Sequence, residues 1–369
     1  MTTSWLRTFE ARAVGSYAPR AADLAVFRIL YASFVLVAHV PRAAWLPLAP
    51  RAFFYPPMGP AALFTATPPP SVLLGLNALL SLFAAMLLVG WRTGVASAGT
   101  GLTLLVLDAW AYSLGGHISH HDILLVVTPL MLGFSGWGRA LSVDATRYSS
   151  LDRERAEAWP VTLLALLIGF AMFTSGWAKA TTGWIDPELR CTYGHFVYNY
   201  LFTGRETWAA PWALRFDSGW FWKGADWATV ALELAFLPAA IHRRSFLLIL
   251  AVATLFHLGI LLLFDIAFSA NILVYGAFVR YTEWPLFRTL GTLSPLPRSK
   301  AVVAFVLAFA VGLGATLGGK TAASALHIPL REIVVWVGAG VGAGYIIWTL
   351  WDMGRKKWRQ IYVQRTTVA

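Results

Sequence analysis

The stretch Val161-Thr-Leu-Leu-Ala-Leu-Leu-Ile-Gly-Phe-Ala-Met-Phe-Thr-Ser-Gly-Trp-Ala178 is an apolar run that ends at one lysine, Lys179. It contains no charged residue, and a helix needs about 20 apolar residues to cross the hydrocarbon of a bilayer. The run therefore predicts a transmembrane helix with a cation at its end. Its small residues allow neighbouring helices to approach closely. Two tryptophans near the lysine, Trp177 and Trp184, are typical of a membrane interface.

The composition of the whole chain agrees with a membrane protein. Of the 369 residues, 58% are hydrophobic and 13% are charged, whereas about 25% of the residues of a soluble domain are charged. The apolar runs are continuous rather than alternating, which favours transmembrane helices over a β-barrel. We expect an all-α polytopic membrane protein with about nine to ten transmembrane helices and both termini in the cytoplasm.

The charge and the cysteine count exclude several other classes of protein. The net charge of +11 does not indicate a nucleic-acid partner, because the basic residues cluster between apolar runs, as the positive-inside rule describes. A single cysteine, Cys191, excludes an internal disulfide framework and a cysteine-based zinc site. The N-terminal segment is polar and lacks a small-residue cleavage site, so we expect the first apolar run to remain as a span.

The sequence predicts four parts. Residues 1–22 form an amphipathic cytoplasmic lead-in, residues 23–300 a membrane bundle, residues 301–352 two additional transmembrane helices, and residues 353–369 a basic cytoplasmic tail. Within the bundle, spans are predicted over 23–40, 71–90, 94–114, 122–135, 161–178, 226–241 and 246–264, and a segment over 266–279 that crosses or re-enters.

The tryptophan-rich segment 179–225 is predicted to be a long extracytoplasmic loop. The distribution of Lys and Arg among the segments between the spans places this loop, Lys179 and the histidines before residue 122 on the extracytoplasmic side.

Ionisable residues inside spans are costly and are therefore candidates for function. His117, His120 and His121 share one helix face if their segment is helical, and they lie next to Asp122. Three interpretations are open for this cluster: metal ligands, a hydrogen-bonded site for a polar substrate, or histidines that cap the span.

Two further ionisable residues, His257 and Glu233, lie in the middle of predicted spans. Each must have a buried partner, which is either part of a functional site or a structural polar contact. Lys179 has a more specific chemistry, because desolvation lowers the pKa of a lysine well below its ordinary value of about 10.4. It then acts as a neutral base toward a weak acid carried by a lipid-soluble substrate.

Four stretches carry a resemblance to a known family: Phe27-Arg-Ile-Leu30; His121-Asp-Ile-Leu-Leu, leading through Trp137-Gly-Arg-Ala-Leu-Ser-Val-Asp144; Gly176-Trp-Ala-Lys179 with Trp184; and Phe256-His257-Leu. They are similar to the HTTM family, the bacterial relatives of the membrane part of vitamin K-dependent gamma-carboxylase. The resemblance covers most of residues 15–300.

This resemblance implies that Lys179 is the base that deprotonates reduced vitamin K or another quinol. It also implies that His121 is the nearby essential histidine and that His257 is the buried histidine of a later span. In that family, oxygenation of the quinol produces a strong base that removes the γ-proton of a peptide glutamate, and the carbanion takes up carbon dioxide. The implied protein is a carboxylase-like lyase of the bacterial inner membrane, and its partners are membrane lipids, a lipid-soluble quinol and a peptide substrate.

The resulting hypothesis is an enzyme with an extracytoplasmic cavity lined by Lys179 and His121 as catalytic residues. The expected cofactor-binding residues are His257, His120, His117, Trp177, Trp184 and Glu233, and the hypothesis includes no metal. The alternative is a non-enzymatic transporter or assembly factor in which these residues form a structural polar network. The two hypotheses differ in whether the residues converge on one pocket that opens to the bilayer.

Overall fold

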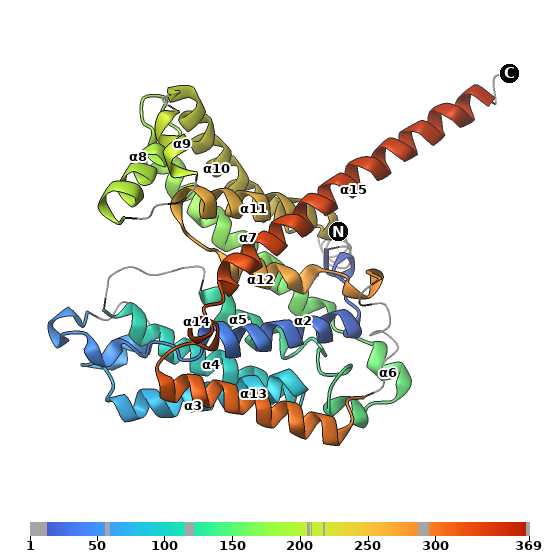
Figure 1. Ribbon diagram of the computed structural model, residues 1–369. Coiled ribbons are helices and arrows are strands. Elements are labelled where there is room, and N and C mark those ends of the chain that lie inside the picture. The colour runs from blue at the N-terminus through green and yellow to red at the C-terminus, as the bar shows by residue number, and fades with distance from the viewer. Residues whose placement is uncertain are drawn as a thin grey trace, which may run out of the picture. The chain divides into compact units, whose positions relative to one another are not determined.

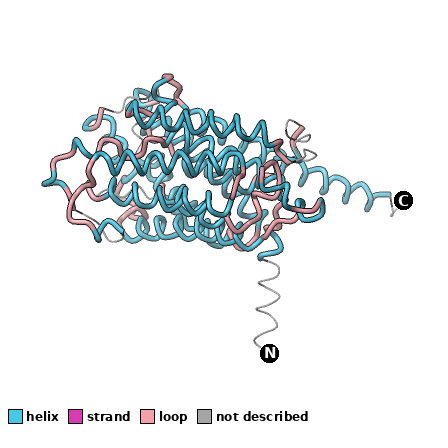
Figure 2. The backbone as a smooth tube through the Cα atoms, turned by 90° about the horizontal axis from the view of Figure 1, so that it is seen from below, coloured by secondary structure: helices cyan, strands magenta, loops and turns pink. Residues whose placement is uncertain are grey.

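The computed structural model describes residues 13–55, 60–114, 122–204, 207, 209–216, 218–285, 287 and 295–366. All regular structure in these ranges is helical, and Figure 2 shows helices joined by loops. The chain divides into two compact units, one formed by Met1–Ala165 with Leu273–Leu330 and one by Leu166–Ile272 with Arg331–Ala369.

Within these ranges, seven helices are long and apolar enough to cross a membrane. Each of them coincides with a predicted span, which confirms an all-helical integral membrane protein. The seven extend over Ala21–His39, Pro70–Val89, Thr93–Tyr112, Ser150–Thr181, Arg243–Phe264, Arg298–Gly318 and Leu330–Lys356.

The other three predicted spans form different structures. The fourth predicted span is the short helix α5, Ile123–Leu132, and the segment 266–279 contains α12, Ser269–Tyr275, and a 3-10 turn, Gly276–Phe278. A helix rises about 1.5 Å per residue, so helices of this length do not cover a hydrocarbon layer of about 30 Å. The predicted span over 226–241 is part of α10, Gly219–Ala239. This helix is 21 residues long but contains several charged residues.

The prediction of a loop over 179–225 is wrong for much of that segment. The structure contains the last turn of α7 (Ala158–Thr181), then α8 (Cys191–Val197), a π-helical turn (Tyr198–Phe202), α9 (Ala210–Arg215) and the start of α10. These helices are too short to produce a long apolar run, and their shared core stabilises them instead. That core consists of Phe196, Ala210, Ala213 and Trp222.

The first unit is built around α2 (Ala21–Phe34), α3 (Pro70–Val89), α4 (Thr93–Tyr112), α5 and α13 (Arg298–Gly318). Helix α3 packs against both α4 and α13, which run alongside it in Figure 1. A Cβ atom added at Gly312 of α13 would lie 2.6 Å from the Ser81 hydroxyl oxygen of α3. The glycine therefore allows the two helices to approach closely, as small residues do between transmembrane helices.

Two stretches that resemble the HTTM family meet in this unit. The guanidinium of Arg28 is buried and donates hydrogen bonds to the carbonyl oxygens of Trp137 and Leu141, at 2.8 and 2.6 Å. Three residues after Leu141, the carboxylate of Asp144 accepts a hydrogen bond from the backbone N–H of Thr93 at 2.7 Å, at the start of α4. These stretches therefore have an architectural role, because they join α2 and the start of α4 to one loop.

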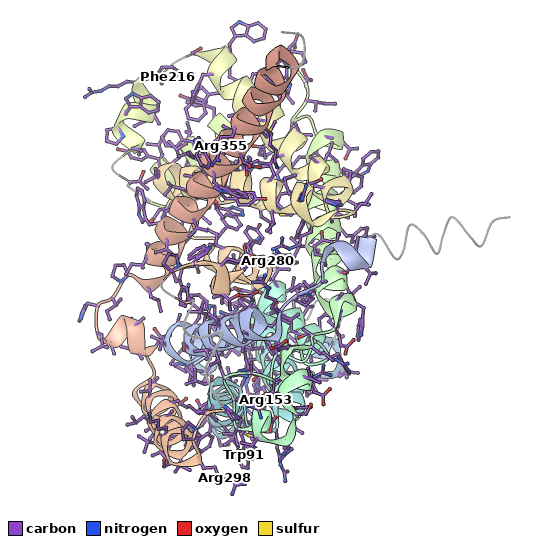
Figure 3. All side chains as sticks on the ribbon, turned by 90° about the vertical axis from the view of Figure 1, so that its right-hand side faces the viewer. Trp91, Arg153, Phe216, Arg280, Arg298 and Arg355 are labelled. Atoms are coloured by element: carbon purple, nitrogen blue, oxygen red, sulfur yellow. The ribbon has the colours of Figure 1, made fainter. Side chains whose placement is uncertain are left out.

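The second unit combines α8, α9 and α10 with α11, Arg243–Phe264, and α15, Leu330–Thr366. Leu263 and Phe264, at the end of α11, pack against the core that α8, α9 and α10 share. A Cβ atom at Gly342 of α15 would lie 2.2 Å from the Thr254 hydroxyl oxygen of α11, so α15 also makes a close contact through glycine. Helix α15 carries Arg355, which is labelled in Figure 3.

Asp144→Ala tests the architectural role of the family stretch. The substitution removes the acceptor at the start of α4 and a negative charge close to the buried Arg28. We expect the free energy of unfolding in detergent micelles to fall by about 2 kcal/mol. Asp152 of α6 (Ser150–Glu154), a half-exposed carboxylate, is the matched control, and Asp152→Ala should change the stability by at most about 0.5 kcal/mol. Equal losses in the two variants would contradict the role assigned to Asp144.

Candidate functional site

A close ion pair joins α7 to α10 in the second unit. The ammonium of Lys179 lies 2.7 Å from each carboxylate oxygen of Glu233 and also donates to the Ser175 hydroxyl at 2.8 Å. The lysine side chain is 23% exposed and the glutamate side chain 8%. Two charges that the sequence places in separate apolar segments therefore neutralise each other, as intramembrane charges generally must.

Glycine residues on α7 make this contact possible. A Cβ atom at Gly176 would lie 2.8 Å from the Glu233 Cβ and 3.0 Å from the backbone nitrogen of Leu234. Gly169, two helical turns earlier on the same face, is in similarly close contact with Ala240. Because neither position has room for a side chain, the two helices are held at a short distance and Lys179 reaches Glu233 directly.

The indole of Trp184 lies against the same ammonium. The Lys179 nitrogen is 5.5 Å from the centre of the Trp184 ring, within the range of a cation–π interaction. The turn that carries this ring is held by α10, because Lys223 donates to the Trp184 carbonyl at 2.9 Å. In addition, the indole of Trp227 donates to the Ile185 carbonyl at 3.2 Å. Helix α10 thus supplies the carboxylate and also fixes the aromatic ring beside it.

A second ion pair, Lys223 with Asp226, supports this turn from the interior. The two groups are 3.0 Å apart, and their side chains are 2% and 0% exposed. Asp226 also accepts hydrogen bonds from the backbone N–H groups of Cys191 and Thr192, at 3.0 and 2.7 Å, and so caps the start of α8. Sequence analysis missed this pair because it assigned Lys223 to a loop, although the i, i+3 spacing of the two charges on a helix is a usable signal.

The structure brings together three of the residues predicted for the site: Lys179, Glu233 and Trp184. Trp177 is 59% exposed and stacks on Phe173 of its own helix, with 6.4 Å between the ring centres. Its predicted contact with a cofactor remains a prediction.

The predicted histidines have different positions. His257 is buried in α11, and its ring stacks on Phe268 with 4.8 Å between the ring centres. Its cofactor role remains a prediction. His117, His120 and His121 lie outside the described residues, so the three interpretations of their cluster also remain predictions.

A polar cluster in the first unit has a centre that the sequence did not reveal. The Arg42 guanidinium donates hydrogen bonds of 2.6 Å to both Asp108 and Asp122. The backbone N–H of Arg42 also donates to the side-chain oxygen of Asn77. Burial lowers the pKa of Arg42, but the two carboxylates raise it more, so the pKa lies above its ordinary value. Arg42 lies outside the apolar runs, and its distance along the chain from both partners hid the contact.

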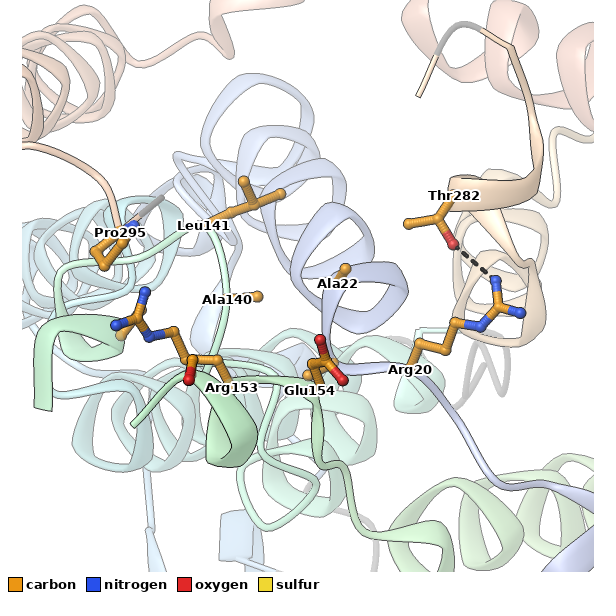
Figure 4. A pocket seen from close by; sticks show the side chains of 11 residues that line it. Arg20, Ala22, Ala140, Leu141, Arg153, Glu154, Thr282 and Pro295 are labelled. Atoms are coloured by element: carbon orange, nitrogen blue, oxygen red, sulfur yellow. Dashed lines mark hydrogen bonds between the residues drawn. The ribbon is translucent and has the colours of Figure 1, made fainter. Parts of the chain in front are cut away.

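A hollow of about 440 Å³ also lies in the first unit, beside the start of α2 and α6. Figure 4 shows Arg20, Arg153 and Glu154 around it, with Arg20 donating to the Thr282 hydroxyl at 3.2 Å. None of the described residues that line it was predicted as a site residue. Its lining belongs to the first unit, whereas Lys179 and Glu233 belong to the second.

These features define a polytopic, all-helical integral membrane protein with an ion pair between two of its helices. The HTTM domain matches residues 17–284 of the chain. Since the match covers more than half of the chain, the protein belongs to the HTTM family, whose domain is found in vitamin K-dependent gamma-carboxylase. Neither the curated proteins nor the solved structures contain a match. The site lies inside the matched residues, and α13 and α15 lie outside them.

A double-mutant cycle tests the pairing of Lys179 with Glu233. Lys179→Met leaves a buried carboxylate without its cation, and Glu233→Gln leaves the ammonium without its carboxylate. We expect each change to lower the free energy of unfolding by about 3 kcal/mol. The double variant removes both charges and should regain about 2 kcal/mol. Unfolding of all four proteins in mixed micelles gives the coupling free energy.

The exposed pair of Asp352 and Lys356 on α15, 2.6 Å apart, is the matched control. Its coupling free energy should not exceed about 0.5 kcal/mol, because exposed pairs on a helix are weak. Additive effects at Lys179 and Glu233 would contradict a direct ion pair.

The one cysteine reports on the Lys223–Asp226 pair. Burial raises the pKa of the Cys191 thiol, Asp226 raises it further, and Lys223 opposes that rise. Maleimides react with the thiolate, so the pH midpoint of labelling should lie above that of a free cysteine. Lys223→Met should move this midpoint to higher pH and Asp226→Asn to lower pH. A lower midpoint in both variants would indicate local unfolding and would contradict the electrostatic assignment.

Proposed function

We propose that this protein is a membrane enzyme related in chemistry to the gamma-carboxylases, in which Lys179 accepts a proton from a lipid-soluble quinol such as reduced vitamin K. The observation that carries the proposal is the ion pair of Lys179 with Glu233. A charged pair is costly inside a membrane protein compared with apolar side chains of similar size. Membership in the HTTM family supports the same chemistry.

The ion pair gives Lys179 a way to become neutral. A lysine is a base only after its ammonium has lost a proton, and both oxygens of Glu233 are 2.7 Å from that ammonium. Transfer of one proton to Glu233 leaves a neutral amine beside a neutral carboxyl group. The amine then takes the proton of the substrate hydroxyl and becomes an ammonium again, while Glu233 keeps the proton that Lys179 gave up.

The residues around Lys179 fit the hydroxyl group of a flat aromatic molecule. Trp184 offers the face of an aromatic ring next to the ammonium, and aromatic rings pack favourably against one another. The Ser175 hydroxyl, 2.8 Å from the ammonium, is a further hydrogen-bonding group at the same point. When bound, the quinol would supply the oxidation chemistry that follows deprotonation.

The proposal keeps the predicted roles of the remaining residues. His257 anchors the polar head of the quinol, His120, His117 and Trp177 also bind the quinol, and His121 orients it or receives a proton. We place the site on the extracytoplasmic side from the distribution of Lys and Arg.

The second candidate is a non-enzymatic transporter or assembly factor. One observation favours it: the three protons of the Lys179 ammonium already have three acceptors, two on Glu233 and one on Ser175. In this candidate function the pair joins α7 to α10 and does no chemistry.

Lys179→Arg separates the two candidate functions. Arginine keeps the positive charge but cannot act as a base. We expect the variant to fold, to pair with Glu233 and to lower the rate of quinol consumption at least about 100-fold. Lys320→Arg, at an exposed lysine after α13, is the control and should keep the wild-type rate. A Lys179→Arg variant that consumes quinol at the wild-type rate would rule out Lys179 as the base.

Mass spectrometry of lipid extracts identifies the bound molecule. We expect a quinone to co-purify with the wild-type protein and to be depleted in Lys179→Ala and His257→Ala. Absence of a quinone from the wild type, with both variants as stable as the wild type, would favour the non-enzymatic function.

A further inference from the structure

Several aromatic side chains are exposed on the helices that replace the predicted loop. Trp220 is 76% exposed and Phe202 is 77% exposed. We call this surface the outer aromatic layer; it consists of Tyr198, Phe202, Trp212, Phe216, Trp220 and Trp227. Phe216, at the end of α9, is labelled in Figure 3.

The layer lies outside a core that is already complete. Phe196 and Trp222 stack in the interior with 5.5 Å between their ring centres, and both are almost fully buried. Farther out, Trp212 stacks on Phe216 at 5.2 Å, and Phe216 meets Phe221 edge-on at 4.7 Å. Since α8, α9 and α10 already share a buried core, their outer aromatic side chains are not needed to complete this fold.

We propose that the outer aromatic layer is inserted into the lipid bilayer at the depth where headgroups meet hydrocarbon. These side chains are not typical of a surface that faces water, because soluble proteins rarely expose so many aromatic rings. Two residues of the layer, Trp220 and Trp227, lie on α10, which pairs with the spanning helix α7 through Glu233 and Lys179.

The type of side chain identifies the depth. Tryptophan and tyrosine concentrate at both boundaries of the hydrocarbon, where an apolar ring and a polar group are accommodated together. The exposed large hydrophobic residues of α13, including Val302, Val306 and Leu307, are aliphatic instead, as expected for hydrocarbon. Arg215, exposed at the end of α9 between Trp212 and Phe216 in the sequence, is suited to a lipid phosphate.

This inference also gives a depth for the neighbourhood of Lys179. Trp227 belongs to the layer, and its indole donates to the Ile185 carbonyl, in the turn that holds Trp184 over the ammonium. The segment 179–225, which the sequence predicts as an extracytoplasmic loop, thus lies between the ion pair and the headgroup region. The location of the layer does not rest on the proposed function, because it requires no reaction at Lys179.

Spin labels measure the location of the layer in the full-length protein, reconstituted in vesicles of phosphatidylcholine and phosphatidylglycerol. Cys191→Ser provides a background without other thiols. Trp212→Cys and Trp220→Cys then carry the nitroxide. Val306→Cys on α13 is the reference for hydrocarbon, and Glu188→Cys, exposed between α7 and α8, is the reference for water. Power-saturation measurements give the accessibility of each label to oxygen and to a water-soluble nickel chelate.

At 212 and 220 we expect the ratio of oxygen to nickel accessibility to lie above that at 188 and below that at 306. A ratio equal to that at 188 would place the layer in water and overturn the inference. Low accessibility to both reagents would show that protein covers the layer, either a second copy or another partner, and would overturn it as well. Helix content and monodisperse elution of each labelled protein verify the fold. Quinol consumption is not part of the readout, so the proposed function and this inference fail independently.

Discussion

A charge that enters a low-dielectric environment must be paired, and this constraint connects distant parts of the chain. In the second unit, Lys179 and Glu233 are 54 residues apart in sequence, yet their charged groups are in direct contact. In the first unit, Arg42 and Asp108 are 66 residues apart. An unpaired charge at any of these places would cost several kcal/mol. Pairing therefore selects which helices become neighbours, whereas the apolar surfaces alone would allow many arrangements in lipid.

Small residues determine how closely those neighbours approach. Lipid tails are as apolar as leucine, so close packing between helices depends on contact rather than on the hydrophobic effect. Gly176 brings α7 against the backbone of α10 next to Glu233, and Gly312 brings α13 against Ser81 of α3. The ion pair of Lys179 depends on this arrangement, because a larger residue at 176 would push Glu233 away from the ammonium.

The sequence predicts the features that are local and misses those that depend on distant contacts. Span prediction succeeds for seven helices because continuous apolar length is a local property. It fails between 179 and 225, where α8 and α9 are short and pack on a core formed with α10 and α11. The importance of Arg42 also follows from distant contacts, and that of Lys223 follows in part from its contact with the distant Trp184 carbonyl.

The candidate site shows the same division. Lys179, Trp184 and Glu233 were identified separately, from the position of each residue relative to the apolar runs, and the structure adds the contacts that join them. The family stretches at Arg28 and Asp144 could not be assigned a role from sequence, because their hydrogen bonds join α2, the start of α4 and a loop far away along the chain. A motif thus indicates family membership more directly than it indicates chemistry.

The two lysine–carboxylate pairs of α10 differ in a way that bears on function. Asp226 accepts hydrogen bonds from Lys223 and from the backbone N–H groups of Cys191 and Thr192. Its architectural role explains all of these contacts. Glu233 is bonded through both oxygens to one ammonium, which is itself 23% exposed. A proton that moves from Lys179 to Glu233 stays within that single contact, whereas a proton placed on Asp226 would disrupt the cap of α8. Of the two pairs, the proposed proton transfer rests on the one between α7 and α10, and the other holds the turn of Trp184 beside it.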